Sequence, residues 1–311
     1  MDRTYPFTSV QDYSIQSDVD GVLITARLYQ PTTTIFGPPG ETPTAVFLHS
    51  WLMTSEMWLD IVIKLTAQGS QCLTIDRRGY GPSQWTNPSR PIAINIGVFT
   101  QDLVSVMRRL NLAWYVIVGS GIGCNESLTA LTRYPESFSN CRGLVWIAPL
   151  LPFPEQSPES PGTPPRIVWD TMCQGLTRWN PSRAQYMWNI FCEIAQQEGQ
   201  INNTNDIVEW QRHLMRAVPD AVTDTLPAFL DEVGYNDQLV LLDRDPAFKH
   251  MRVVLIHGAN DRGNPESATT ARIARRVSRS MRVVLPNTGP AIHKTNAVAI
   301  VRLIWKAQFG L

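Results

Sequence analysis

The chain lacks the features that mark secreted, membrane-spanning or metal-bound proteins. No apolar run approaches the roughly eighteen residues that a membrane span requires. No apolar segment follows a basic start, so we expect no secretory leader. The 5 cysteines are odd in number and contain no C-x-x-C pair, which argues against a zinc site or a disulfide framework. We therefore expect a cytoplasmic protein with reduced thiols and without metal or cofactor.

The chain also lacks an excess of charge of either sign. Lys and Arg together number 27, and so do Asp and Glu, which gives a net charge of zero. This balance favours neither nucleic acid nor an anionic membrane surface as a partner. Hydrophobic residues make up 43% of the 311 residues, enough for a sizeable core. A small molecule is the expected partner, and the composition leaves the oligomeric state open.

Short apolar segments alternate with amphipathic ones in the two outer parts of the chain. Apolar segments suited to strands occupy residues 21–29, 45–49, 71–75, 115–118, 143–147, 252–257 and 281–285. Between them, apolar residues at helical spacing occupy 57–65, 96–110, 123–134, 265–277 and 296–309. This alternation predicts an α/β fold, with about eight strands in a mostly parallel sheet and helices on both faces.

The alternation breaks after residue 150. Six prolines lie within residues 151–165, a linker composition, and residues 166–242 then have helical character with several tryptophans. We therefore predict a core formed by residues 1–150 and 243–311, with residues 151–242 inserted as a helical lid.

Four segments resemble motifs of the α/β-hydrolase superfamily. Val46–Trp51 resembles the strand that ends in a His-Gly turn, and Asp76–Ser83 resembles the D-x-R-G-x-G-x-S turn. Val116–Cys124 is similar to the nucleophile-elbow segment, and Val253–Asp261 to the approach to the catalytic acid. The likeness is to the lidded branch that includes epoxide hydrolases, haloalkane dehalogenases and cofactor-free dioxygenases. It implies an α/β-hydrolase fold.

The elbow segment has glycine where this family presents its nucleophile. An elbow exposes one strained side chain and needs small residues two positions before and two after it. Gly119 and Gly123 meet that need and place Gly121 at the centre. The competing register centres Ser120, but it puts larger residues at the crowded positions. With Gly121 at the centre, no acyl- or alkyl-enzyme can form on the elbow itself.

The acid and base positions differ in how well they are preserved. Asp261 stands where the resemblance places the acid, although it can instead cap the following helix. Pro290 occupies the place of the family's histidine, and His293 follows three residues later. A structural role for His293 is the alternative to one as acid or base.

Backbone donors can survive the loss of the nucleophile. The amide of Ile122 begins the elbow helix, and a second donor lies at or near Trp51, so a carbonyl can still be polarised. Other candidate nucleophiles are Ser50, Ser120 and Cys124, of which Cys124 is expected to pack as a small apolar residue.

Ten tryptophans favour an apolar, shape-selective pocket under the lid. We expect substrate contacts from Ser50, Trp51, Ser120, Gly121, Ile122 and Trp188, and catalytic roles for Asp261 and His293. Some hydrolase-fold cyclases of specialised metabolism have a similar pattern. Our leading hypothesis is therefore a non-hydrolytic cyclase or isomerase that acts on a hydrophobic natural-product-like molecule. Its reaction would be pericyclase-like, with intramolecular Diels-Alder closure as one form. One alternative is a hydrolase with a displaced site, using Ser120 or Ser50 with His293 and Asp261. Others are a non-catalytic small-molecule binding protein and a cofactor-free oxygenase.

Overall fold

The protein folds around one eight-stranded sheet, with strand order β1-β2-β4-β3-β5-β6-β7-β8. The structure is a computed structural model that describes residues 7–35, 41–151, 165–176, 212–213 and 215–310. The strands are β1 Phe7–Gln16, β2 Leu23–Pro31, β3 Thr44–Leu48, β4 Gln71–Asp76, β5 Tyr115–Ser120, β6 Cys141–Ile147, β7 Arg252–Gly258 and β8 Met281–Leu285. β2 pairs antiparallel with both β1 and β4, and the pairs from β4 to β8 are parallel. The predicted mostly parallel sheet of about eight strands is confirmed.

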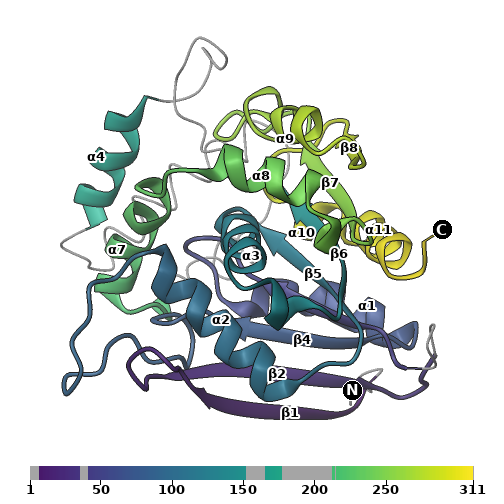
Figure 1. The fold of residues 1–311 in the computed structure, drawn as a ribbon, viewed down its shortest axis with the longest axis horizontal. Coiled ribbons are helices and arrows are strands. Elements are labelled where there is room, and N and C mark those ends of the chain that lie inside the picture. Colours follow the sequence, from purple (N-terminus) through teal and green to yellow (C-terminus); the bar gives the residue numbers. More distant parts are fainter. Residues whose placement is uncertain (1–6, 36–40, 152–164, 177–211, 214, 311) are drawn as a thin grey trace.

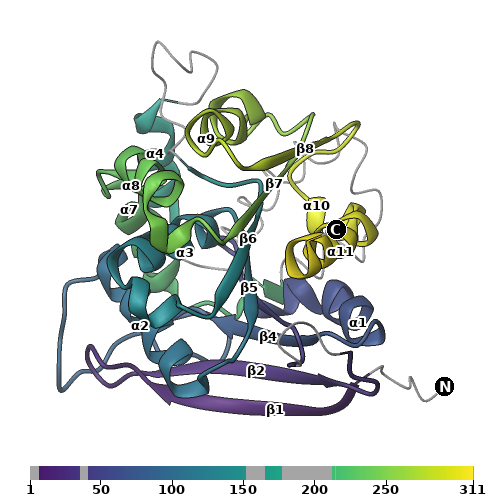
Figure 2. The same cartoon turned by 45° about the vertical axis from the view of Figure 1, so that its right-hand side comes forward.

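Helices cover both faces of the sheet (Figures 1 and 2). One face carries α2 Ile96–Leu110, α3 Ile122–Arg133, α8 Tyr235–Arg244 and α9 Thr270–Arg276; the other carries α1 Leu59–Ala67 and α11 Ala297–Phe309. Two buried apolar clusters, one on each face, match this division. The strands β3, β5 and β6 read as nearly unbroken apolar runs because both of their faces are covered.

The segment after β6 holds α4 Arg166–Leu176 and α7 Pro219–Leu230. It lies where the helical lid was predicted, and the predicted boundary at residue 242 falls inside α8, which packs on α3. The division into core and lid stays a prediction. Trp188 lies outside the described residues. Across the part of the chain that is described, no helix has both the length and the apolar character to cross a membrane.

Parallel strands bring the motif residues to one edge of the sheet. β3, β4, β5 and β7 end at Leu48, Asp76, Ser120 and Gly258, and parallel strands present their carboxyl ends together. The loops carrying Ser50, Gly121 and Asp261 therefore start from the same edge. This edge is where ligands bind in open α/β sheets.

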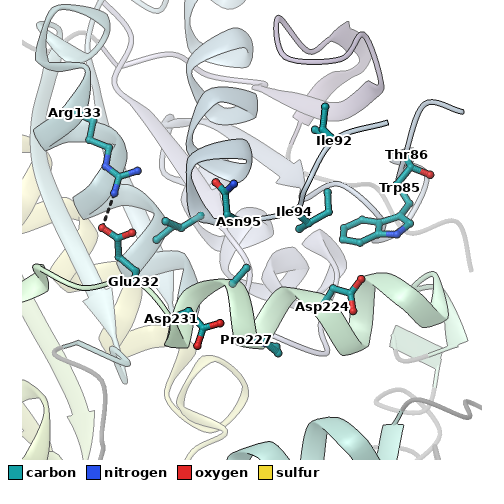
Figure 3. A pocket seen from close by; sticks show the side chains of 12 residues that line it. Trp85, Thr86, Ile92, Ile94, Asn95, Arg133, Asp224, Pro227, Asp231 and Glu232 are labelled. Carbon is teal, nitrogen blue, oxygen red and sulfur yellow. Dashed lines mark hydrogen bonds and ion pairs between the residues drawn. The ribbon is translucent and has the colours of Figure 1, made fainter. Parts of the chain in front are cut away.

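A hollow of about 570 Å³ lies between α7, the last turn of α3 and the segment 85–96. Figure 3 shows Asp224 and Pro227 of α7, and Asp231 directly after it, across from Trp85 and Ile94. The pair Arg133–Glu232 closes one end. Arg133 is the last residue of α3, roughly 16 Å along the helix from its first residue.

Candidate active site

The turn from β5 into α3 is centred on Gly121. Its backbone has φ +54° and ψ −119°, a conformation that residues with a side chain adopt only under strain. A Cβ on Gly119 would lie 2.8 Å from the Gly123 carbonyl carbon, and one on Gly123 would lie 2.6 Å from the Leu48 carbonyl oxygen. Both neighbours must therefore be glycine. Ser120 is the last residue of β5. Gly121, and not Ser120, is therefore the central residue of the elbow.

Ser50 lies directly above Gly121. A Cβ built on Gly121 would overlap the Ser50 hydroxyl oxygen, and its next nearest neighbours are the Cβ and Cα of the same serine. The Ser50 side chain is half-buried, and its hydroxyl has no hydrogen-bond partner among the described residues. A serine hydroxyl thus occupies the space over the elbow, although it comes from the loop after β3.

The loop that carries Ser50 is a tight turn. The Ser50 carbonyl accepts from the Met53 amide at 3.3 Å, and Leu52 has φ +67°, which is costly for a residue that is not glycine. The backbone N–H groups of Trp51 and Ile122 have no acceptor within the described part of the chain. Ile122 is the first residue of α3, where amides lack partners inside the helix. These two donors remain open to an oxyanion.

A buried network under the elbow holds this loop. Arg77 donates to Glu126 of α3 at 2.6 Å and to the His49 carbonyl at 3.0 Å. Its own amide donates to Nε2 of His49 at 3.0 Å, so the proton of that ring is on Nδ1, which donates to the Ser50 carbonyl at 2.8 Å. Burial and the adjacent Arg77 keep the pKa of His49 well below its usual value. His49 is therefore a neutral positioning group for Ser50.

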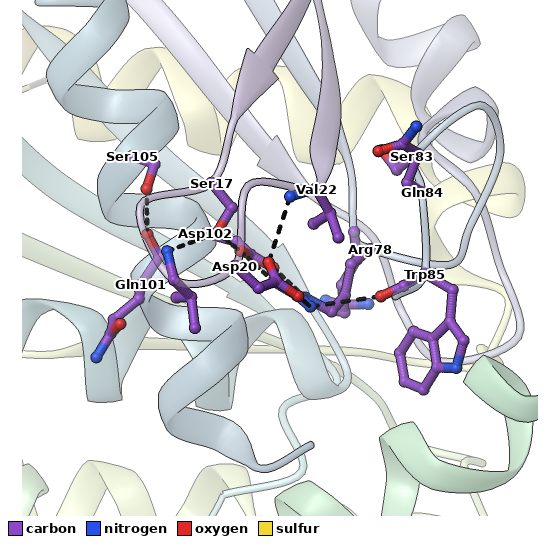
Figure 4. A network of polar contacts seen from close by, with 12 residues as sticks. Ser17, Asp20, Val22, Arg78, Ser83, Gln84, Trp85, Gln101, Asp102 and Ser105 are labelled. Carbon is purple, nitrogen blue, oxygen red and sulfur yellow. Dashed lines mark hydrogen bonds and ion pairs between the residues drawn. The ribbon is translucent and has the colours of Figure 1, made fainter. Parts of the chain in front are cut away.

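The same motif turn supplies a second buried ion network. Arg78 donates to Asp102 of α2 at 2.5 Å and to Asp20 at 3.1 Å, and Ser17 also donates to Asp102 (Figure 4). Asp76 accepts from the Ser55 amide at 2.7 Å and from its hydroxyl at 2.9 Å, while burial raises the pKa of its carboxyl. The charged residues of this motif are thus engaged in buried structural contacts.

Asp261 follows β7, where the family places its acid. Its carboxylate accepts from the Asn264 amide at 2.9 Å and lies 3.6 Å from Nε2 of His257. No hydrogen bond joins it to His293 within the described ranges. The contact with Asn264 closes a local turn, and the helical segments that follow begin after Pro265 and Thr269 without a side-chain cap.

His293 lies in the short helix α10 Ile292–Thr295, three residues after Pro290. Its ring packs edge-on to the buried Trp58, with the ring centres 6.4 Å apart. Burial, together with the neighbouring His213 and Lys294, lowers the pKa of His293 to about 3. The ring is therefore neutral at physiological pH and is a weak proton acceptor.

The other residues singled out from the sequence lie in different surroundings. The Trp51 indole donates to the Val222 carbonyl at 3.0 Å, which anchors it to α7. Ile122 is fully buried at the elbow, and Ser120 is buried in β5. Cys124 is buried in α3, and burial raises the pKa of its thiol. Within the described ranges, no three His, Cys, Asp or Glu side chains cluster as metal ligands.

His213 was not singled out from the sequence. It lies in the segment before α7 and is buried, with Nδ1 2.7 Å from the Thr54 hydroxyl. Its charge also contributes to lowering the pKa values of His49 and His293, so its ring lies within electrostatic range of both. No local motif marks this histidine, because its partners lie about 160 residues earlier and 80 residues later in the chain.

An eight-stranded, mostly parallel sheet with a strand–turn–helix elbow at its carboxyl edge defines a protein of the α/β-hydrolase class. The chain belongs to the alpha/beta hydrolase family, whose model matches residues 45–303. It is 26% identical over 255 residues to a putative non-heme chloroperoxidase from Synechocystis, covering 81% of this chain and 86% of that protein. These matches confirm the resemblance inferred from the four sequence motifs.

Solved structures show the same fold. An esterase from Exiguobacterium antarcticum superposes with a TM-score of 0.78 at 19% identity, covering 95% of this chain and 98% of the esterase. A bromoperoxidase from Bacillus anthracis superposes with a TM-score of 0.77 at 17% identity, covering 95% of this chain and all of that protein (100%).

Proposed function

We propose that the protein is an acyl-transfer hydrolase that acts on esters, with the Ser50 hydroxyl as its displaced nucleophile. The position of that hydroxyl over Gly121 is the observation that carries the proposal. In the family's usual arrangement the hydroxyl rises from the elbow residue. Here the elbow residue has no side chain, and a hydroxyl enters the same space from the neighbouring loop.

The chemistry follows from the groups around Ser50. Its Oγ attacks the ester carbonyl carbon, and the hydroxyl proton passes to a base. The oxyanion that forms accepts from the amides of Trp51 and Ile122, and the alkoxide then leaves with the proton. Water attacks the acyl group on Ser50, which releases the carboxylic acid and restores the hydroxyl. Asp261 keeps its family position but supports the loop after β7 in this scheme.

The names of the relatives favour this hydrolase alternative over the cyclase hypothesis. They are an esterase and haloperoxidases of the same fold, and none of these names describes ring closure. The cyclase or isomerase remains a second candidate because Gly121 offers no nucleophile and Pro290 no imidazole. It would use the same amide donors to polarise a carbonyl, without a covalent step.

Two serine variants test the proposal. With short-chain p-nitrophenyl esters, we expect Ser50→Ala to lower kcat/KM by more than about a hundredfold, since losing a nucleophile removes most of the rate. Ser120→Ala is the matched control, because its serine lies one residue before the elbow, and it should retain turnover. A fluorophosphonate should add to the wild-type chain at Ser50 when the site is mapped by peptide mass spectrometry.

Three results would reject the assignment: label on Ser120, unchanged turnover in Ser50→Ala, or neither labelling nor ester turnover in the wild type. The last result would leave the cyclase candidate as the better account of the site.

A further inference from the structure

One side of the hollow beside α7 is a single stripe of that helix. Asp224, Pro227, Ala228 and Asp231 line it, and residues three and four positions apart share one helix face. The stripe has a carboxylate at each end and apolar side chains between them. Seven residues of helix span roughly 10 Å, so the apolar stretch has the length of a small organic molecule.

The opposite side of the hollow is apolar. Trp85, Ile92 and Ile94 line it from the segment between β4 and α2, and each of the three is buried or half-buried. The volume of about 570 Å³ lies inside the range of small-molecule sites, about 300–1,000 Å³. The hollow can therefore enclose an apolar body between two preformed sides.

Trp85 is held in a fixed position at one end of the hollow. A Cβ on Gly79 would lie 2.8 Å from Cε3 of Trp85, so the ring packs on the bare backbone of that glycine. The Trp85 carbonyl accepts from the buried Arg78 at 3.4 Å. Trp85 is only 9% exposed, yet its indole N–H has no hydrogen-bond partner among the described residues. A buried indole usually has such a partner, so this donor is available to a ligand.

The charges around the hollow are balanced at one end only. Arg133 pairs with Glu232 at 2.5 Å, and Arg166 pairs with Asp231 at 2.7 Å. Asp224 has no ion pair within the described ranges. Figure 3 shows the Arg133–Glu232 pair at one end of the hollow and Asp224 below the Trp85 ring at the other. An uncompensated negative charge therefore lies at the aromatic end.

We propose that this hollow binds a hydrophobic amine that carries one positive charge and an oxygen acceptor close to it. The ammonium lies between the Trp85 ring and the Asp224 carboxylate, because an aromatic face and a carboxylate both attract a cation. The oxygen accepts from the indole N–H, and the apolar body packs between Ile94 and Pro227. This site does not depend on the proposed hydrolase function.

Fluorine NMR of the full chain labelled with 5-fluorotryptophan locates a bound amine. Trp85→Phe identifies the Trp85 signal by its loss. We expect 3-phenoxypropylamine, which is protonated at neutral pH, to shift that signal in a saturable manner. The neutral analogue 3-phenoxypropan-1-ol should bind at least about threefold more weakly, because it lacks the charge that Trp85 and Asp224 attract. The amine 4-phenylbutylamine, with a methylene in place of the ether oxygen, should also bind more weakly.

Variants measured by calorimetry test the two groups that hold the ammonium. Asp224→Asn should weaken 3-phenoxypropylamine binding about two- to fivefold, as for an exposed ion pair, and about 1 M salt should remove the difference. Asp60→Asn is the matched control, because it removes the same charge from the exposed start of α1 on the other face of the sheet. Trp85→Leu should weaken binding about 2- to 30-fold, the range of a cation–π contact. Thermal unfolding establishes that each variant is folded.

Four results would overturn the proposal in identifiable parts. Equal weakening by Asp224→Asn and Asp60→Asn would mean that the amine responds only to net charge. Shifts of other tryptophan signals with the Trp85 signal unchanged would place the amine elsewhere. Equal affinity for the neutral alcohol would reject the cation, and equal affinity for 4-phenylbutylamine would reject the role of the indole N–H.

Discussion

At the scale of single residues, Gly121 and Ser50 constrain each other, because a side chain on Gly121 would overlap the Ser50 side chain. The positive φ of Gly121 and the serine above it each disfavour a side chain at this position, for different reasons. Sequence alone could find the glycine, because its two flanking glycines fix the register of the elbow. Sequence alone could not decide between Ser50 and Ser120, because that choice depends on how the loop after β3 turns over α3.

Gly121→Ala should separate strain from overlap when it is compared with Gly234→Ala. Gly234 also has a positive φ, +99°, but a Cβ there would meet nothing within 4 Å. Its replacement should cost only the backbone strain, about 1 kcal/mol. Gly121→Ala adds the collision with Ser50 and should cost about 1–3 kcal/mol more. Urea unfolding measures both values.

A double variant completes this comparison. Adding Ser50→Gly to Gly121→Ala removes the overlapping hydroxyl and should recover the additional cost while the strain remains. Equal costs for the two alanine variants would show that Ser50 does not fill the space over the elbow.

At the scale of elements, the sequence predicted the strands that carry apolar runs better than a strand that lacks one. β8 has the predicted bounds, and α2 matches its predicted range. β1 was missed because its residues are mostly exposed and carry no apolar alternation. What holds β1 and β2 to the rest is partly ionic: Ser17 and Asp20, between these strands, meet Arg78 and Asp102. Such a network joins segments that are distant in the sequence, so no local pattern predicts it.

Asp102→Ala should destabilise the fold far more than the loss of a surface pair. Arg78 is fully buried, and removing one of its two carboxylates leaves donors of Arg78 and Ser17 unsatisfied. Breaking a buried pair in this way costs about 3–5 kcal/mol, with the lower end expected here because Asp20 remains. Glu136→Ala breaks the exposed pair with Arg108 and should cost less than about 1 kcal/mol.

Equilibrium unfolding in urea at neutral pH measures both losses. If the two variants lose the same stability, the Arg78 network does not hold the β1–β2 pair to α2.

At the scale of the whole molecule, the same architecture that assembles the site buries ionisable groups on several elements. The sequence established which strand ends meet, because parallel strands share a carboxyl edge. It gave no sign of His213, whose approach depends on how the segment before α7 returns to the core. Nor did it show that His293 is buried against Trp58, since a single histidine in a short helix has no distinctive pattern.

Burial of neutral imidazoles predicts a loss of stability in acid. Burial lowers the pKa of His293 to about 3 in the folded chain, against the usual 6.5 of a histidine. Between these two values the unfolded chain binds a proton that the folded chain does not, so stability falls as the pH drops from about 6.5 towards 3, by up to about 1.4 kcal/mol per pH unit. The lowered pKa of His49 acts in the same direction, while the raised pKa values of Asp76 and Glu126 oppose it.

Comparing wild type with His293→Gln isolates one imidazole, because the other groups are common to both. Urea unfolding at pH 7, 6, 5 and 4 should show a shallower decline for the variant, and parallel declines would mean that His293 takes up its proton without unfolding.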